Sequence, residues 1–122
     1  MVKLIFPLRR LGKLSREQFQ KYWFETHGPL VRKHAQALRI RRYVQVHTLD
    51  DPINGLLKQG RNGQEPYDGV AELWWDSRED MEKAFTTAEG RTAAQELLED
   101  EKNFIDLPRS SLWIANERPV IG

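Results

Sequence analysis

The sequence predicts an α+β domain in which helices cover one face of a four-stranded antiparallel sheet. The apolar pattern changes period along the chain and gives, in order, a strand, a helix, two strands, a helix and a strand. With 122 residues the chain is long enough for one core. No repeat, low-complexity tract or linker divides residues 1–122 into smaller units. This order of elements is the split βαβ arrangement of a ferredoxin-like fold.

The first strand is expected at residues 2–8, which are almost entirely apolar. Pro7 places the end of this strand at a margin of the sheet, because proline cannot donate a hydrogen bond to a neighbouring strand. Ser15 and Gln18 have the spacing of a capping box and predict that a helix begins there. The core-facing stripe of this helix recurs at intervals of three, four or seven residues and comprises Phe19, Trp23, Thr26, Leu30 and Ala37.

An interruption of this first helix is predicted at Gly28-Pro29. Proline has no N–H and its ring clashes with the carbonyl four residues earlier, so the helix should kink or restart there. His27 directly precedes the interruption and lies with His34 on one edge of the apolar stripe. A helix interrupted beside an imidazole frees polar groups in the core, and this predicts a pocket with a titratable group in its wall.

The second strand is expected within residues 40–48, where alternation places Tyr43 and His47 on the same face. Residues 49–66 form a long polar connection with Asn-Gly and Gly turn signals. Connections of this length are uncommon in small domains unless they are functional or mobile. A lid, a dimer-bridging arm and an ordinary surface loop are the three interpretations of this segment.

The second half of the chain repeats the strand and helix pattern. A third strand is predicted at residues 68–75, and Ser77 caps the helix that follows it. Gly90 should break this helix, so that a further helical segment runs from about residue 91 to about residue 102. The last strand is expected at residues 111–115.

One face of the sheet should lack cover, since the helices occupy a single face. Tyr43, the apolar residues of the third strand and Trp113 would then meet water. Removing apolar area from water is worth ~25 cal/mol per Å², and a second copy packed sheet to sheet would remove much of it. The sequence therefore predicts a homodimer.

Composition excludes several classes of partner. The net charge of +1 at pH 7 gives no strong attraction to nucleic acid or to a membrane surface. The chain has no cysteine, which excludes disulfides, a thiolate nucleophile and a cysteine zinc site. No apolar run has the length of a membrane span, and the apolar start is too short for a signal peptide, so we expect a cytoplasmic protein.

Several strings of residues are together similar to one known family. They are Leu14-Ser15-Arg16-Glu17-Gln18-Phe19-Gln20-Lys21-Tyr22-Trp23, His27-Gly28-Pro29-Leu30, Glu72-Leu73-Trp74-Trp75-Asp76-Ser77 and Asp100-Glu101-Lys102-Asn103-Phe104-Ile105-Asp106. On these strings, which extend over nearly the whole chain, it resembles the EthD family of the dimeric α+β barrel superfamily. That family is named for a protein associated with ether degradation. The resemblance implies a ferredoxin-like domain that pairs with a second copy.

The resemblance also implies a range of activities. Similar domains are dehydratases and decarboxylases of aromatic polyketide pathways, and other barrels of the superfamily are cofactor-free monooxygenases. A related lactone isomerase has a histidine in the place of His27 and a tyrosine that matches Tyr43. What these proteins share is an apolar pocket between sheet and helices, which takes a small hydrophobic organic ligand and needs neither a metal nor an organic cofactor.

These arguments select the candidate site residues. His27 is the candidate general acid or base, and Tyr43 would donate a hydrogen bond to a substrate oxygen. Phe6, Trp23 and Trp74 are the candidates for the wall of the substrate pocket. In the alternative reading, His27 bonds the backbone freed by the proline and Tyr43 is an interface residue.

The expected function is a cofactor-independent isomerase, dehydratase or decarboxylase acting on an aromatic or polyketide-like molecule. The alternatives are a non-catalytic ligand-binding or accessory protein of a catabolic pathway and a cofactor-free monooxygenase. A metal site of His27, His34 and His47 has no recognised ligand spacing to support it. His47 is expected at the dimer contact, and Glu72 is expected to pair with an arginine at the sheet edge.

Overall fold

A computed structural model describes residues 1–122 and contains one four-stranded sheet. The strands are β1 (Val2–Leu8), β2 (Arg42–His47), β3 (Gly69–Trp75) and β4 (Trp113–Ala115). Their order across the sheet is β2-β3-β1-β4, and every neighbouring pair is antiparallel. This topology confirms the predicted ferredoxin-like α+β fold.

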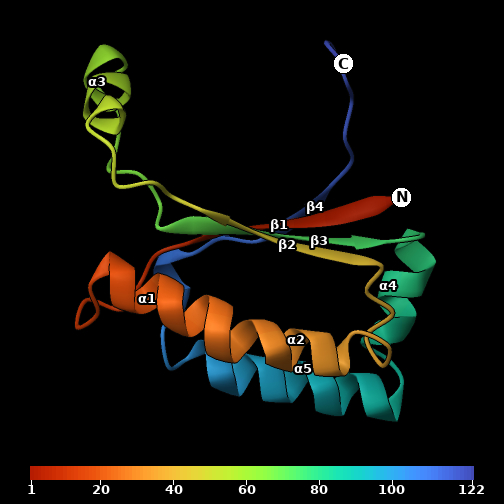
Figure 1. Ribbon diagram of the computed structural model, residues 1–122. Coiled ribbons are helices and arrows are strands. Elements are labelled where there is room, and N and C mark those ends of the chain that lie inside the picture. The colour runs from red at the N-terminus through yellow and green to blue at the C-terminus, as the bar shows by residue number, and fades with distance from the viewer.

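The helices lie mainly on one face of the sheet (Figure 1). They are α1 (Arg16–Tyr22), the π-helix η1 (Trp23–His27), α2 (Gly28–His34), α4 (Arg78–Ala84) and α5 (Ala88–Glu101). The short 3-10 helix η2 (Leu107–Arg109) precedes β4. Helix α3 (Ile53–Gly60) and the C-terminal tail instead rise from the opposite face of the sheet. No helix combines the length and the apolar composition that a bilayer crossing requires.

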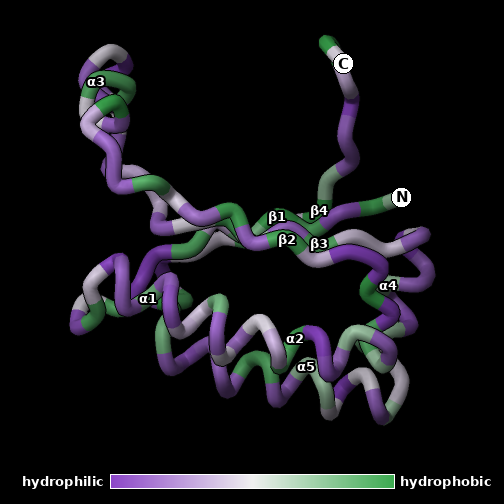
Figure 2. The backbone as a smooth tube through the Cα atoms, in the orientation of Figure 1, coloured by the Kyte–Doolittle hydropathy of each residue, from purple (hydrophilic) through white to green (hydrophobic).

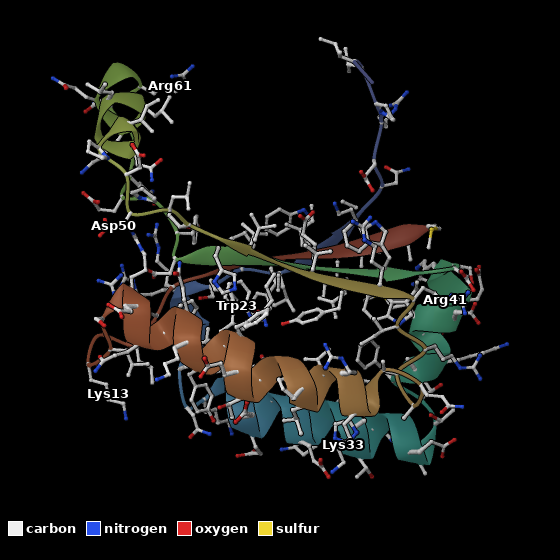
Figure 3. The ribbon with its side chains drawn as sticks, viewed as in Figure 1. Lys13, Trp23, Lys33, Arg41, Asp50 and Arg61 are labelled. Carbon is white, nitrogen blue, oxygen red and sulfur yellow. The ribbon has the colours of Figure 1, made fainter.

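Two groups of buried side chains form the core between the sheet and the helices. The first comprises Phe6, Leu8, Phe19, Trp23, Ala71, Phe104 and Ile105, and the second comprises Val31, Leu38, Ala84, Ala93 and Leu97. Trp23 belongs to the first group and points from the first helix toward the sheet (Figure 3). Tyr43 packs against both groups, so it lies where the two parts of the core meet.

The first helix passes through a π turn and does not break at Gly28-Pro29. The Gly28 N–H donates to the Trp23 carbonyl five residues earlier, and Pro29 occupies the first turn of α2. Proline has no N–H to donate to the carbonyl four residues earlier, and the wider π turn fits the chain around this missing donor. The predicted interruption is therefore a local change in helix type, and His27 is its last residue.

One prediction for the helix ends was wrong, and one helix was missed. Gly90 lies inside α5 and does not end a helix, because Thr87 caps α5 by accepting from the Gly90 N–H. A Cβ at Gly90 would lie 1.7 Å from the Ala84 carbonyl oxygen, so glycine allows a close approach of α4 and α5 there. The connection of residues 49–66 contains the helix α3, which sequence analysis did not predict.

The two faces of the sheet differ in cover. Tyr43, Gln45 and His47 of β2 point toward the helices, and Trp23 contacts the last two of them. Tyr43 therefore does not lie on the bare face, where it was predicted. Trp74 does lie on the bare face, stacked against the Lys3 ammonium, which forms an ion pair with Glu72. The partner of Glu72 is thus a lysine in the middle of the sheet and not an edge arginine.

Candidate functional site

A small cavity lies between the sheet and the helices. Its volume is about 150 Å³, and 16 of its 18 lining residues are hydrophobic. The other two are His27 and Glu101, and Tyr43 adds a hydroxyl to the wall. Such a space, apolar with a few convergent polar groups, is the usual form of a small-molecule site.

His27 is the histidine of this wall and is held by an acid from a neighbouring helix. It is only 5% exposed, and its Nδ1 lies 2.7 Å from Oδ2 of Asp100 in α5. A carboxylate can only accept, so Nδ1 carries the proton and Nε2 keeps its lone pair. Burial lowers the pKa of His27 below its ordinary value of 6.5, although Asp100 acts in the opposite direction. The imidazole is therefore neutral at pH 7 and able to accept a proton at Nε2.

Asp100 is fixed in its ionised form by three donors. Burial opposes ionisation, but hydrogen bonds from Tyr22, His27 and Asn103 outweigh it and lower the pKa of the Asp100 carboxyl. The Tyr22 hydroxyl donates to Oδ1 over 2.5 Å, and the Asn103 amide donates to the same oxygen over 3.3 Å. Asp100 thus fixes both the orientation and the tautomer of His27.

Glu101, the next residue of α5, has the opposite protonation behaviour. Its carboxyl makes no hydrogen bond within the protein, and it lines the cavity. Burial, helped by the neighbouring charge of Asp100, raises the pKa of Glu101 from 4.5 to about 7. A carboxyl that is half protonated near neutral pH can both give and take a proton.

Tyr43 provides a hydrogen-bond donor on the sheet side of the cavity. Gln45 Nε2 donates to the Tyr43 hydroxyl and to the Trp23 carbonyl, each over 2.9 Å. The amide oxygen of Gln45 lies 2.8 Å from His47 Nε2 and accepts from it. Since the Tyr43 oxygen accepts from Gln45, its own proton is not used in that hydrogen bond. Burial raises the pKa of Tyr43 to about 12, so this proton stays in place at neutral pH.

The structure places the other predicted residues in different surroundings. Phe6 and Trp23 line the cavity, but Trp74 does not, because it alternates to the bare face of the sheet. His47 stacks on Trp23 with ring centroids 4.5 Å apart, at the helix-covered face and away from the face predicted for the dimer. His34 pairs with Glu96. No group of three or more acidic, histidine or cysteine side chains could hold a metal ion.

Asp100, Glu101 and Gln45 are the functional candidates that sequence reasoning missed. Two adjacent acids at the C-terminal end of α5 are unfavourable there, since the helix dipole favours cations at that end. The last turn of α5 contains no basic residue to offset them. This local contradiction was the available signal for Asp100 and Glu101, whereas Gln45 had none.

The family profile that matches the chain is that of the EthD domain. The EthD domain profile matches residues 12–108. An EthD family protein of Bacillus halodurans has a similar structure, with a TM-score of 0.64, 24% identity, and coverage of 97% of this chain and 99% of that one. No curated protein sequence matches the chain significantly.

Two more distant structures have the same fold. A dimeric ferredoxin-like protein of unknown function from Bacteroides fragilis gives a TM-score of 0.58 at 10% identity, with 95% of each chain covered. SnoaB, a cofactor-independent oxygenase from Streptomyces nogalater, gives a TM-score of 0.54 at 12% identity, with coverage of 98% of this chain and 95% of that one. At this level of identity the likeness concerns the fold alone.

Proposed function

Because the chain belongs to the EthD family, we propose that it is a cofactor-independent enzyme that moves protons on a small organic molecule in the cavity. One observation carries this proposal. His27, which Asp100 holds from behind, and Glu101 line the same apolar space and have different proton affinities. Titratable groups whose surroundings separate their pKa values are the usual mark of an acid and base pair.

The proposed reaction begins at a carbon next to a carbonyl. His27 Nε2 takes a proton from this carbon and becomes an imidazolium, which the Asp100 carboxylate stabilises. The C–H electron pair moves into the carbonyl, and the Tyr43 O–H donates a hydrogen bond to the resulting enolate oxygen. Protonated Glu101 then delivers its proton at the other end of the conjugated system, and solvent returns a proton from His27 to Glu101.

This chemistry accommodates two of the three reaction types that the family resemblance implies, isomerisation and dehydration. Proton delivery to carbon gives an isomerisation. Proton delivery to a leaving hydroxyl group gives a dehydration, with loss of water. Positioned acids and bases contribute about 10²- to 10⁴-fold to such rates, and each hydrogen bond to a developing oxyanion contributes about 10²- to 10³-fold.

The isomerisation of 3-cyclohexen-1-one to its conjugated isomer in D2O tests the proposal. Ultraviolet absorbance follows the product and NMR follows deuterium uptake. We expect His27→Gln to reduce the rate by about 100-fold or more, with an unchanged circular dichroism spectrum. His34→Gln is the matched control, because His34 lies outside the cavity and should keep full activity. Equal rates in the wild type and in His27→Gln would contradict the proposal.

Two other functions use the same cavity. SnoaB, a protein of similar fold, is a cofactor-independent oxygenase, and the same activity in this chain would use His27 to deprotonate a phenol. It predicts oxygen consumption with electron-rich phenols and no added flavin or metal. A non-catalytic binding protein would bind the same molecules but would neither exchange their protons nor consume oxygen.

We further propose that a second copy covers the bare face of the sheet. Val46 and Trp113 are 44% and 46% exposed on this face, and the Lys3–Glu72 ion pair lies on the same face. A protein with a similar fold is dimeric. Pairing of the two sheets would remove the exposed apolar side chains from water.

A further inference from the structure

The size of the cavity limits what it can hold. Pockets for drug-sized ligands have volumes of roughly 300–1,000 Å³, whereas this cavity has about 150 Å³. An apolar cavity of about 150 Å³ in another protein holds one benzene molecule. The volume therefore matches one six-membered ring and is small for two fused rings.

The charge of the wall limits the ligand as well. No lysine or arginine lines the cavity. Lys3 and Arg42 of the sheet lie on the bare face against Trp74. A carboxylate ligand would therefore enter an apolar space without a cationic partner, and burying such a charge is strongly unfavourable. Glu101 in its ionised form, with Asp100 behind it, would repel the anion further.

The polar groups select the substituents of the ring. Tyr43 offers a hydroxyl proton, His27 offers an acceptor at Nε2, and Glu101 offers either a donor or an acceptor. A carbonyl or hydroxyl oxygen on the ring would satisfy the Tyr43 donor. An acidic C–H or O–H of the same ring would face His27. The remaining lining residues are apolar and match an unsubstituted ring edge.

We infer that the natural ligand is an uncharged, single-ring ketone, enone or phenol, and that the cavity rejects carboxylates and fused-ring molecules. This inference rests on the proposed function for the location of the site, but it concerns selectivity, which binding alone can measure. It narrows the expected substrate class, because polyketide-like molecules with several fused rings do not fit the volume.

Three probes test this selectivity in the full-length protein. They are 2-cyclohexen-1-one, cyclohex-1-ene-1-carboxylate, which adds a charge to the same ring, and 1-tetralone, which adds a fused ring. Binding is followed by the backbone amide shifts of His27, Tyr43 and Ala94. We expect saturable binding of the enone, at least tenfold weaker binding of the carboxylate and no binding of 1-tetralone. Carboxylate or tetralone binding at the same residues with equal or higher affinity would overturn the inference.

A pair of variants on one helix confirms the location. Ala94 of α5 lines the cavity, so Ala94→Leu should fill it and abolish enone binding. Ala88 of the same helix is exposed, and Ala88→Leu should bind the enone as the wild type does. Enone binding that survives in Ala94→Leu would place the ligand elsewhere and overturn the inference.

The failure of this inference and the failure of the proposed function give different results. Selective enone binding without any His27-dependent proton exchange would contradict the proposed enzymatic function and support the inferred class of ligand. His27-dependent proton exchange together with a preference for 1-tetralone or the carboxylate would support the proposed enzymatic function and contradict the inferred class of ligand.

Discussion

Asp100 and Glu101 are neighbours in sequence, yet their surroundings give them opposite protonation at neutral pH. Asp100 receives three hydrogen bonds, which hold its pKa low in spite of burial. Glu101 receives none, and burial raises its pKa to about 7. The two pKa values differ because the two side chains point in different directions. Asp100 points to Tyr22 and His27, whereas Glu101 lines the cavity. One helix turn can thus provide both a fixed anion and a proton donor.

The activity should depend on pH through two of these groups. His27 must be neutral to accept a proton, so the rate should rise as pH passes upward through its pKa, which lies below 6.5. Glu101 must be protonated to give one, so the rate should fall as pH passes upward through about 7. We expect a bell-shaped profile of kcat/KM with a narrow maximum slightly acid of neutrality. Glu101→Gln should lower the rate and abolish the alkaline limb, and an unchanged alkaline limb would exclude Glu101 as the acid.

Gln45 should act as a positioning residue for Tyr43. Gln45→Met keeps the side-chain length but removes the hydrogen-bond donor to the Tyr43 hydroxyl. The Tyr43 O–H bond is then no longer held in one orientation. The loss of one such hydrogen bond is worth about 1 kcal/mol, so we expect kcat to fall about fivefold with little change in KM. The NMR shift of Tyr43 Cζ should change as well. Gln20→Met is the control, because the Gln20 amide donates to the Thr48 and Asp68 carbonyls and not to Tyr43.

At the scale of elements, Pro29 affects the orientation of His27 through the π turn that precedes it. Pro29 cannot donate to the carbonyl four residues earlier, and the chain widens to η1 directly before it. A π turn adds a residue to the helical turn and rotates the side chains that follow. His27, as the last residue of η1, is thereby directed at Asp100 of the neighbouring helix.

Pro29→Ala tests this connection. Alanine supplies the missing N–H, so the segment should relax toward a regular α-helix and turn His27 away from Asp100. We expect unchanged or increased thermal stability, together with a loss of activity of roughly 100-fold for a displacement of about 1 Å. The NMR shift of the His27 Nδ1 proton reports the hydrogen bond directly. Pro52→Ala at the start of α3 is the control. A variant with the wild-type proton shift would show that Pro29 does not set the turn.

The sequence predicted the elements whose signals are local. The capping box at Ser15 was found, and the structure contains both of its hydrogen bonds. The alternation in β3 correctly grouped Glu72 with Trp74, but alternation does not tell which face meets the helices, and Trp74 was assigned to the pocket for that reason. Helix α3 was missed because its glycines read as turn signals, although its apolar residues have helical spacing.

The candidate site was predictable only in part, for a similar reason. His27 and Tyr43 each belong to a local sequence pattern. For His27 the pattern is the apolar helix stripe that ends at Gly28-Pro29, and for Tyr43 it is the alternation of the second strand. The partners of His27 come from residues more than 70 positions away in the chain, and the pKa of Glu101 depends on how α5 packs over the cavity. Long-range packing of this kind leaves no periodic trace in the sequence.

At the scale of the whole molecule, the side of the sheet away from the main helices remains open. Helix α3 and the C-terminal tail both rise on this side and flank the sheet face (Figure 1). Hydrophobic segments alternate with polar ones along α3 (Figure 2), and its residues Ile53, Leu56 and Leu57 are all more than half exposed. A second copy seated on the sheet would lie between these two projections, where it could cover the apolar side chains of α3.

Sedimentation velocity at micromolar concentration tests whether a second copy takes this place. We expect the wild type to sediment as a dimer, because pairing would remove the exposed apolar side chains of the open face from water. Val46→Glu and Trp113→Glu each put a charge on that face and should yield monomers, since like charges would meet across the two-fold interface. Leu98→Glu changes an exposed apolar residue of α5 outside the sheet and should leave the dimer intact. A wild-type monomer would show that the open face is stable in water, and a dimer insensitive to both sheet variants would place the interface on another surface.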